Sequence, residues 1–300
     1  MNKNPQIVCF GEILWDVFPD KKVIGGAPLN VALRMHSQGH SVAIISSIGK
    51  DEEGQNIIKF LEHERFCILG IQKDEHLKTG SVRVSLNHQG SASYKIMAPV
   101  AWDAIAFTSE AEALVKNSKV FIFGSLACRN AKSKETLLKL IEVSEFSVFD
   151  VNLRPPFYAK DLLLQLLSKA NFVKMNEEEL EVISTMLECT ENSLTEQALW
   201  INEKLNLKGI CITKGDKGAI LYYENEFYGH ASIKVAVEDT VGAGDSFLAT
   251  LIGELLIHKT IPSKSLERAC TVGALVASKP GANAIVTERE IQNAILSIKS

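Results

Sequence analysis

The sequence lacks the features that would place this protein in a membrane or on nucleic acid. No apolar stretch among its 300 residues reaches the length needed to cross a bilayer. The formal net charge is −4 with both signs interspersed, so there is neither a basic stripe for nucleic acid nor a polybasic membrane anchor. The chain enters the apolar run Ile7–Phe10 without the apolar region of a signal peptide, which predicts a cytoplasmic location.

Cysteine pairs and zinc spacings are missing as well. The six cysteines stand singly, mostly within apolar runs, and no Cys-x-x-Cys occurs, so we expect buried thiols in a reducing compartment. His36 and His40 are four residues apart, but Gly39 ends the helix there and no Glu follows His36, which argues against zinc. No Gly-x-Ser-x-Gly elbow supports a Ser-His-Asp hydrolase.

What the chain does contain is an alternation of short apolar runs with amphipathic segments. Its composition, 46% hydrophobic and 23% charged, is that of a soluble protein with a large core. The alternation predicts an α/β fold with a mostly parallel sheet covered by helices. The strands are expected at Ile7–Phe10, Val42–Ile48, Val120–Phe123, Ser147–Val151, Phe172–Lys174 and Ile210–Thr213.

Local signals also mark helices and a departure from the alternation. Pro28 and Gly39 bracket one helix, and another begins at Asp51; the chain closes with helices at Leu266–Ser278 and Glu288–Ile298. Strands are expected at Lys21–Ile24 and, as a hairpin with one apolar face, at Ser81–Leu86 and Ala92–Met97. We predict that these strands form a small lid; the alternative is that they extend the central sheet.

Residues 239–247 read Asp-Thr-Val-Gly-Ala-Gly-Asp-Ser-Phe and lead into a helical apolar pattern. The unpaired N–H groups and the positive dipole end of a helix favour an anion, so this segment predicts a phosphate site. Phe247 stands where a dinucleotide fingerprint needs its third glycine, and no Gly-Lys-Ser/Thr follows, which excludes a P-loop. A helix start whose Asp245 only interacts with the dipole is the plain alternative.

A second set of candidate site residues lies near the N-terminus. Asp16 follows a strand end, Gly25 and Gly26 let the backbone approach a ligand closely, and Asn30 offers a donor and an acceptor in the first turn of a helix. Taken singly, Asp16 and Asn30 would be a solvated acid and a capping residue. Together they suit a polyhydroxylated molecule.

These two segments resemble the two signatures of the ribokinase-like (phosphofructokinase-B) sugar kinase family. Gly25-Gly26-Ala-Pro-Leu-Asn30, followed by Gly39 and Gly49, is similar to the first signature, and Asp239-Thr-Val-Gly-Ala-Gly-Asp245 to the second. The resemblance covers essentially the whole chain. It implies one three-layer α/β/α domain over residues 1–300, with lid strands near 12–24 and 80–98 above a sugar site, and transfer of the γ-phosphoryl group of ATP to a sugar hydroxyl.

The resemblance also implies roles for individual residues. Asp245 resembles the catalytic base, and Gly242, Ala243 and Gly244 resemble the anion hole. Asn176 and Glu179 read locally as a capping box, but in the family this Asn-x-x-Glu motif organises Mg²⁺ and its waters, so Glu179 is expected to act on Mg²⁺ through water.

Further positions match the nucleotide site and a cation site of the family. Thr213-Lys-Gly-x-x-Gly218 reads by itself as a solvated hairpin turn, yet it resembles the loop that lines the nucleotide. The resemblance implies ATP contacts at Lys174, Asn176, Thr213, Lys214, Gly215, Gly218 and Asn283. It further implies a site for a monovalent cation such as K⁺ at Asp239, Val241 and Ala282.

The acceptor sugar is indicated by fewer residues. Asp150-Val-Asn-Leu-Arg154 resembles a motif of the fructokinase and 2-keto-3-deoxygluconate kinase branches, which implies sugar contacts at Asn152 and Arg154; Arg154 could equally be a surface cation. The run from Gly11 to Pro19 is similar to bacterial fructokinases, so fructose is the first choice of acceptor. The alternatives are 2-keto-3-deoxygluconate kinase, ribokinase or nucleoside kinase, and a non-catalytic sugar-binding relative. Because some relatives dimerise through their lids, a homodimer through the lid is also expected.

Overall fold

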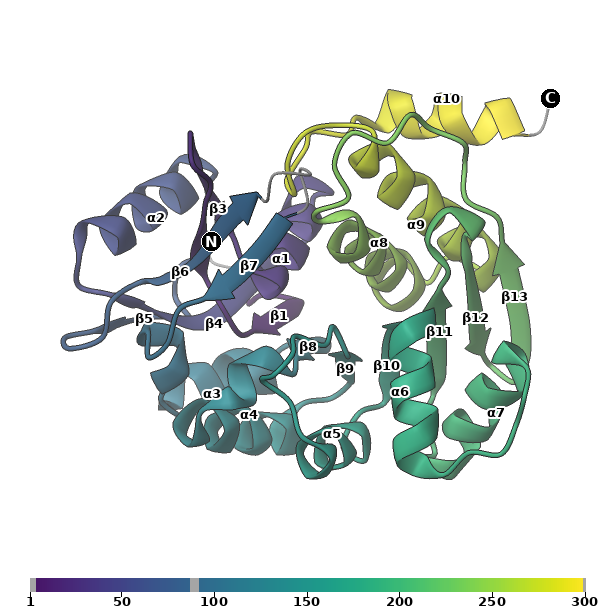
Figure 1. Cartoon of the computed structure of the whole chain (residues 1–300), viewed down its shortest axis with the longest axis horizontal. Coiled ribbons are helices and arrows are strands. Elements are labelled where there is room, and N and C mark those ends of the chain that lie inside the picture. Colours follow the sequence, from purple (N-terminus) through teal and green to yellow (C-terminus); the bar gives the residue numbers. More distant parts are fainter. Residues whose placement is uncertain (1–3, 87–91, 299–300) are drawn as a thin grey trace. The chain divides into compact units, whose positions relative to one another are not determined.

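The computed structural model describes residues 4–86 and 92–298 and divides into two compact units. The first unit comprises Met1–Ala32 and Ser41–Glu145, and the second comprises Leu33–His40 and Phe146–Ser300. Both units combine parallel strands with helices (Figure 1), which confirms the predicted α/β class. The prediction of one domain over residues 1–300 stays a prediction.

Four parallel strands organise the first unit, in the order β8, β1, β4, β5. Every residue of β1 and β4 is buried, as expected for interior strands of a parallel sheet. β1 has the predicted bounds, whereas β5, which has no fully buried residue, was not predicted. The strands are β1 (Ile7–Phe10), β4 (Val42–Gly49), β5 (Ile71–Asp74) and β8 (Val120–Gly124).

The helices of this unit begin at recognisable caps. Asp51 caps α2, since its Oδ1 accepts the Gly54 N–H at 2.8 Å, and Thr108 caps α3 in the same way. The helices are α1 (Ala27–Ser37, whose last turns belong to the second unit), α2 (Glu52–His63), α3 (Ser109–Lys116) and α4 (Ala131–Val143), with 3₁₀ turns at Ala101–Ala104 and Leu126–Arg129.

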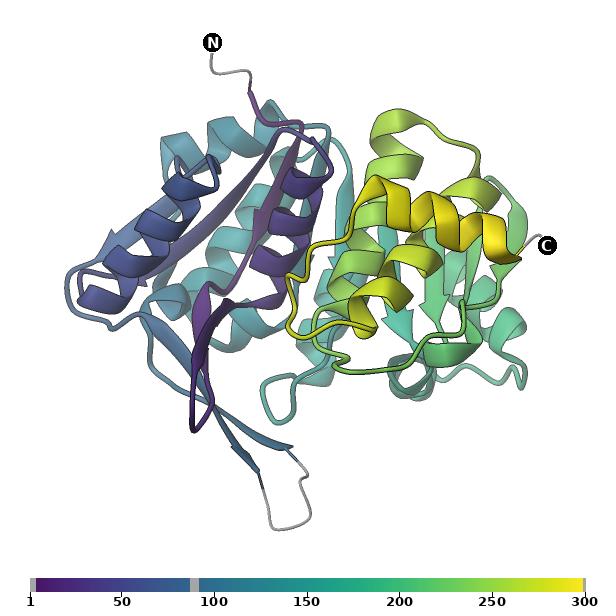
Figure 2. The ribbon, with the colours of Figure 1, turned by 90° about the horizontal axis from the view of Figure 1, so that it is seen from above.

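A separate four-stranded sheet of the first unit confirms the predicted lid strands. Its order is β3, β2, β6, β7, with β2 (Leu14–Val17) parallel to β6 (Gly80–Leu86) and the edge strands β3 (Lys22–Gly25) and β7 (Ala92–Ile96) antiparallel. It stands off from the parallel strands of its unit (Figure 2), so these strands do not extend the parallel sheet. The hairpin turn at residues 87–90 lies outside the described residues, as do the side chains of residues 84–94, so the apolar face stays a prediction.

The second unit contains five strands in the order β9, β10, β11, β12, β13, of which the first three are parallel. α6 and α7 pack on β10–β12, and α9 packs on β12 and β13 (Figure 1). The exposed strand β13 was not predicted. The strands are β9 (Ser147–Asp150), β10 (Phe172–Asn176), β11 (Gly209–Thr213), β12 (Ala219–Tyr223) and β13 (Glu226–His230).

Of the remaining helices of the second unit, α10 has the predicted bounds, whereas α9 begins at Pro262, before the predicted start at Leu266. α10 lies across α9 (Figure 2), and α8 continues into a π-helical turn at Gly253–His258. The helices are α5 (Lys160–Leu167), α6 (Glu177–Leu187), α7 (Leu194–Lys204), α8 (Ala243–Ile252), α9 (Pro262–Ala277) and α10 (Glu288–Ile298), with a 3₁₀ turn at Gly215–Lys217.

Two further predictions can be compared with the structure. All six cysteines are free and four are buried, but Cys67 and Cys189 are only half-buried, so the prediction of buried thiols is wrong for these two. Cys67 lies between α2 and β5, and Cys189 follows the end of α6, so fewer side chains cover these two thiols. In the described part of the chain, no helix has both the length and the apolar composition to cross a membrane.

Candidate active site

The carboxyl ends of three parallel strands of the second unit gather the predicted nucleotide residues. β9 ends at Asp150 beside Lys174 of β10, and β10 ends at Asn176 beside Thr213 of β11. Because parallel strands end at the same edge of a sheet, local sequence order and strand register together place these side chains along one edge. Ligands of open α/β sheets bind at this edge, so it is the natural place for a site.

Lys174 carries a buried positive charge at this edge. Its Nζ donates to Asp150 Oδ1 at 3.0 Å, and both side chains are less than 10% exposed. Burial by itself would lower the pKa of Lys174, but the carboxylates of Asp150, Glu179 and Asp245 outweigh it and hold that pKa above its usual value. Lys174 is therefore a charged ammonium at any pH at which the protein would work.

Glu179 lies in the first turn of α6 and is held by backbone amides. The predicted capping box is confirmed: Asn176 Oδ1 accepts the Glu179 N–H at 2.8 Å, and Glu179 Oε2 accepts the Asn176 N–H at 2.9 Å. The other carboxylate oxygen, Oε1, accepts the Leu153 N–H at 2.8 Å. Burial raises the pKa of Glu179, although the Lys174 ammonium and the amide bonds oppose that shift.

The start of α8 combines a strained glycine with an open one. Gly242 has φ +76°, and a Cβ atom there would lie 2.5 Å from the backbone of Ala282, so only glycine fits. Gly244 is exposed, and a Cβ atom there would lie 3.6 Å from Lys174 Nζ. The Lys174 ammonium therefore lies close to the first turn of α8, whose first amides have no partner within the helix, with the half-buried Asp245 next in the chain.

Asp239 joins this helix start to the loop at 281–284. Its Oδ1 accepts the Val241 N–H and its Oδ2 accepts the Gly281 N–H, both at 3.0 Å. Asp239, Val241 and Ala282, the predicted monovalent-cation residues, thus belong to one joint between two loops. Asn283, the predicted adenine contact, is half-buried in the same loop.

The predicted nucleotide loop after β11 is a tight turn. Lys214 N–H donates to Gly218 O at 2.7 Å, and Gly215 and Gly218 have φ +56° and +93°. A Cβ atom at Gly218 would overlap the carbonyl of His230, so this glycine is required by the strand pair that follows. The turn thus presents Thr213 and Lys214 at the end of β11.

In the first unit, the predicted sugar residues surround the Gly25-Gly26 turn. A Cβ atom at Gly25 would overlap Asp16 Oδ2, and one at Gly26, which has φ +111°, would overlap the carbonyl of Glu12. Asn30 is buried in the first turn of α1, and its N–H donates to Gly26 O at 2.8 Å. The two glycines therefore let a carboxylate and an amide side chain approach the same turn.

The other two predicted sugar residues follow β9 in the second unit. Asn152 is half-buried with φ +37°, a conformation that asparagine tolerates better than most residues. Arg154 is exposed, and its Nη1 donates to Leu153 O at 2.9 Å. The structure thus places Asn152 near the carboxyl edge of its sheet and leaves the Arg154 guanidinium on the surface.

Sequence reasoning missed Asp150 as a site residue. A carboxylate that ends a fully buried strand was visible in the sequence, but its pairing with Lys174 depends on the register of β9 and β10. Within the described residues, no three His, Cys, Asp or Glu side chains form a group that could hold a metal ion. A Mg²⁺ ion fits this edge only as a hydrated ion carried by phosphates, with Glu179 reaching it through water.

Comparisons with known proteins agree with this geometry. The model of the pfkB family carbohydrate kinases matches residues 4–289. Probable fructokinase-6, chloroplastic, from Arabidopsis thaliana is 27% identical, with 98% of this chain and 83% of the relative covered. An uncharacterized sugar kinase from Pyrococcus horikoshii in complex with ATP is 28% identical, with a TM-score of 0.81 and coverage of 96% of this chain and 99% of that one.

A third protein was solved with a sugar. A fructokinase double mutant from Vibrio cholerae O395, in fructose-, ADP- and potassium-bound form, is 22% identical and has a TM-score of 0.82, with 98% of this chain and 100% of that chain covered. At this identity the likeness concerns the fold. The two segments that resemble the family signatures lie in glycine turns that carry polar side chains. Because the family model also spans nearly the whole sequence, this chain belongs to the pfkB family of carbohydrate kinases.

Proposed function

We propose that this pfkB-family kinase transfers the γ-phosphoryl group of ATP to a hydroxyl of fructose. The observation that carries the proposal is the start of α8, where the exposed Gly244 lies beside the buried Lys174 ammonium and directly precedes Asp245. The choice of fructose is supported by relatives named fructokinases and by the fructose bound in the Vibrio cholerae neighbour.

The anion hole is proposed at Gly242, Ala243 and Gly244. Phosphoryl transfer depends on positioning and on stabilising charge that spreads over the transferring oxygens. The first amides of α8 have no partner within the helix, although the Ala243 N–H donates to Thr240 O at 3.3 Å, and their fixed positions need no reorganisation. Lys174, whose side chain is itself buried, adds a full positive charge next to the exposed Gly244.

Asp245 is proposed as the general base. It takes the proton of the attacking sugar hydroxyl while the sugar oxygen forms its bond to the γ-phosphorus and the bond between that phosphorus and the β,γ-bridging oxygen breaks. The products are the sugar phosphate and ADP, and the proton stays on Asp245 until it is released to solvent. The half-buried position of Asp245 leaves it open to a bound hydroxyl.

ATP is proposed to contact the edge formed by Lys174, Asn176 and Thr213, with the turn at Lys214–Gly218 and Asn283 completing the nucleotide site. When bound, Mg²⁺ would neutralise charge on the phosphates. Glu179 is suited to hold its waters because each carboxylate oxygen keeps a spare lone pair beyond its amide bond. A monovalent cation is proposed at Asp239, Val241 and Ala282, supported by the potassium ion of the Vibrio cholerae neighbour.

Sugar contacts are proposed at Asp16, Gly25, Gly26 and Asn30, and, from the motif at residues 150–154, at Asn152 and Arg154. A carboxylate and an amide beside two glycines suit a ligand with several hydroxyl groups. Arg154 is the residue that separates the candidate acceptors, because a guanidinium pairs bidentately with the carboxylate of a sugar acid.

The proposal is tested by measuring ADP release from ATP with fructose, ribose, 2-keto-3-deoxygluconate and adenosine, each with and without K⁺. The highest kcat/KM is expected with fructose. A higher value with 2-keto-3-deoxygluconate would replace the proposed acceptor, and Arg154→Ala should then lower activity on that acid far more than on fructose. Release that depends on none of the four acceptors would contradict the kinase assignment for these substrates and favour a sugar-binding relative.

A further inference from the structure

The end of α1 contributes a buried arginine to the second unit. Arg34 is 5% exposed, and no carboxylate pairs with it among the described residues. Its Nε donates to Ser246 Oγ at 3.0 Å and its Nη2 donates to Ala284 O at 2.6 Å. Burial lowers the pKa of Arg34, but a guanidinium stays charged at working pH.

Both acceptors stand next to proposed site residues. Ser246 follows Asp245 on α8, and Ala284 follows Asn283 in the 281–284 loop. These same two segments meet at two other points, the carboxylate of Asp239 and the close approach of Gly242 to Ala282. Among these contacts between α8 and the 281–284 loop, Arg34 is the one made by a long side chain. Its Nε binds the helix and its Nη2 binds the loop.

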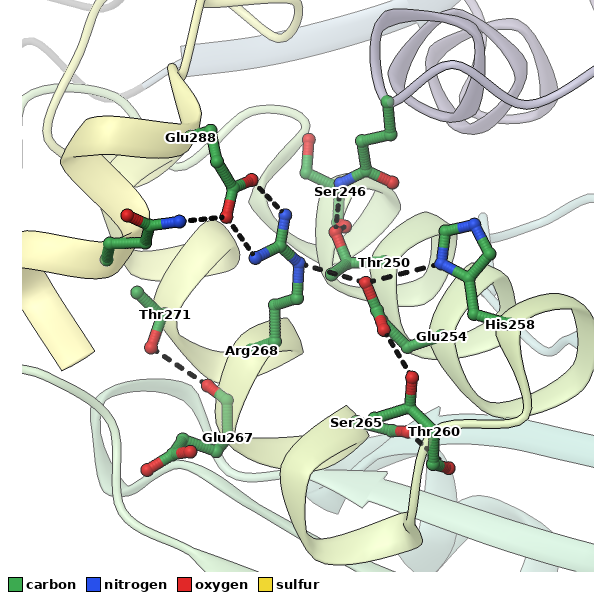
Figure 3. Close-up of polar contacts among 12 residues, drawn as sticks. Ser246, Thr250, Glu254, His258, Thr260, Ser265, Glu267, Arg268, Thr271 and Glu288 are labelled. Carbon is green, nitrogen blue, oxygen red and sulfur yellow. Dashed lines mark hydrogen bonds and ion pairs between the residues drawn. The ribbon is translucent and has the colours of Figure 1, made fainter.

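Three side chains anchor one face of α8 and its π-helical extension at steps of four residues. Arg34 binds Ser246, Gln38 Nε2 donates to Thr250 Oγ1 at 2.7 Å, and Arg268 Nε lies 3.0 Å from Glu254 Oε1. Figure 3 shows Ser246, Thr250 and Glu254 in this order, with Glu254 inside a network of Arg268, Glu288 and His258. Only the Arg34 anchor lies beside Asp245.

We propose that Arg34 is a positioning residue of the phosphoryl-transfer site, which holds the start of α8 against the 281–284 loop so that Asp245 and Asn283 keep their spacing. The proposal rests on the proposed function. If the side chain at this place served folding alone, an apolar residue would cost less free energy to bury. A buried charge loses its hydration, and here it gains only two neutral acceptors. The rigid fork of a guanidinium is what reaches a hydroxyl and a carbonyl at once.

The test compares Arg34→Met with Gln38→Met. Arg34 lies in the last turn of α1 and Gln38 lies four residues later, directly after the helix. Each substitution replaces a donor to α8 by the same flexible apolar side chain, so Gln38→Met is the matched control. We expect kcat/KM for the preferred sugar to fall about 10²-fold in Arg34→Met, with a raised KM for ATP, because a displacement of about 1 Å has an effect of this size. Gln38→Met should stay within a few-fold of the parent.

Rescue by added guanidinium separates positioning from folding. Arg34 lines a cavity of about 270 Å³, together with His40, Glu254 and Arg268, which gives a small cation room to enter. Guanidinium at low millimolar concentration should restore activity to Arg34→Ala but leave Gln38→Ala unchanged, and Arg34→Lys should recover only part of the parent activity because it lacks the fork. Equal kcat and KM in Arg34→Met and Gln38→Met would overturn the proposal while leaving the kinase assignment intact.

Hydrogen exchange tests the role of Arg34 even if the parent protein shows no kinase activity on the four acceptors. Hydrogen exchange should speed up in Arg34→Met at two segments, the amides of residues 242–246 and those of residues 281–284. Exchange in Gln38→Met, measured at the same interval below its own melting temperature, is the reference. Faster exchange at both segments supports the joint that Arg34 forms. Unchanged exchange at either segment overturns it, whatever the acceptor panel shows.

Discussion

The two glycine turns that carry the site residues differ in what their glycines do. At Gly26 an added Cβ atom would overlap the backbone carbonyl of Glu12, so the fold requires this glycine, whereas at Gly25 it would overlap only the side-chain carboxylate of Asp16. At the start of α8, Gly242 meets the backbone of Ala282 in the same way, but Gly244 is exposed and has only the Lys174 ammonium near it.

This difference separates glycines that the fold requires from one that it does not. A helix interior loses stability at glycine relative to alanine, so an exposed glycine in the first turn of α8 has no reason in folding. Its place beside Lys174 leaves room for an anion against the helix amides. The second turn therefore combines a folding glycine with a functional one, and substitutions can test each separately.

The largest expected effect is that of Asp245→Asn on turnover. We expect kcat to fall about 10²–10⁴-fold, the range for a positioned base, because asparagine cannot accept the hydroxyl proton. The melting temperature should stay close to that of the parent, since the side chain is half-buried and keeps its shape. Steady-state kinetics and a thermal melt check both, and a kcat within a few-fold of the parent would show that another group takes the proton.

Gly242→Ala should affect folding more than any other glycine substitution in the second turn. The left-handed conformation costs about 1–2 kcal/mol for alanine, and the Cβ atom would also press on Ala282 at 2.5 Å. Gly39→Ala is the matched control, because Gly39 has φ +85° and no atom within 4 Å of the added Cβ. Urea denaturation should show a clearly larger loss for Gly242→Ala, and equal losses would mean that the contact with Ala282 contributes nothing.

Gly244→Ala should separate activity from stability. The free energy of unfolding should stay the same or rise by up to about 1 kcal/mol, since alanine favours a helix. The methyl group would occupy the space beside Lys174, so kcat/KM for ATP should fall between about 10- and 10²-fold. Parent-like kinetics in a stably folded Gly244→Ala would remove the anion hole from this position.

Glu179→Gln should show the smallest effect, in the pH dependence of stability. Because burial raises the pKa of Glu179, the stability that this group contributes is complete below its unfolded value of about 4.3 and is lost as the pH rises through the folded value. Glutamine resembles the protonated form at every pH. The stability of the variant relative to the parent should therefore increase between pH 4 and pH 7 in urea titrations, and a decrease would contradict the raised pKa.

Local sequence rules were enough for the buried strands and for the caps. The four apolar residues of β1 gave its bounds directly, and the Asn176–Glu179 spacing gave the capping box. The edge strands β5 and β13 were missed because their residues, half-buried in most of β5 and exposed in most of β13, carry no apolar pattern. Such strands are held by backbone bonds to one neighbour, which a local pattern does not report.

Site contacts between distant positions could not be predicted from the sequence. The pairing of Asp150 with Lys174 follows from strand register, and the partners of Arg34 lie 212 and 250 positions further along the chain. The residues around Arg34 in the sequence do not indicate which distant groups accept its hydrogen bonds. Glycine motifs could be read because steric limits act on one residue, whereas ion pairs and anchors depend on tertiary packing.

The central claim is transfer of a phosphoryl group from ATP to a sugar at the start of α8. The most direct measurement follows ATP, ADP and sugar phosphate together by ³¹P NMR while the parent protein acts on fructose. The account predicts that ADP and a fructose phosphate appear in equal amounts, and that Asp245→Asn slows both alike. ADP without sugar phosphate, or equal rates in the parent and in Asp245→Asn, would contradict it.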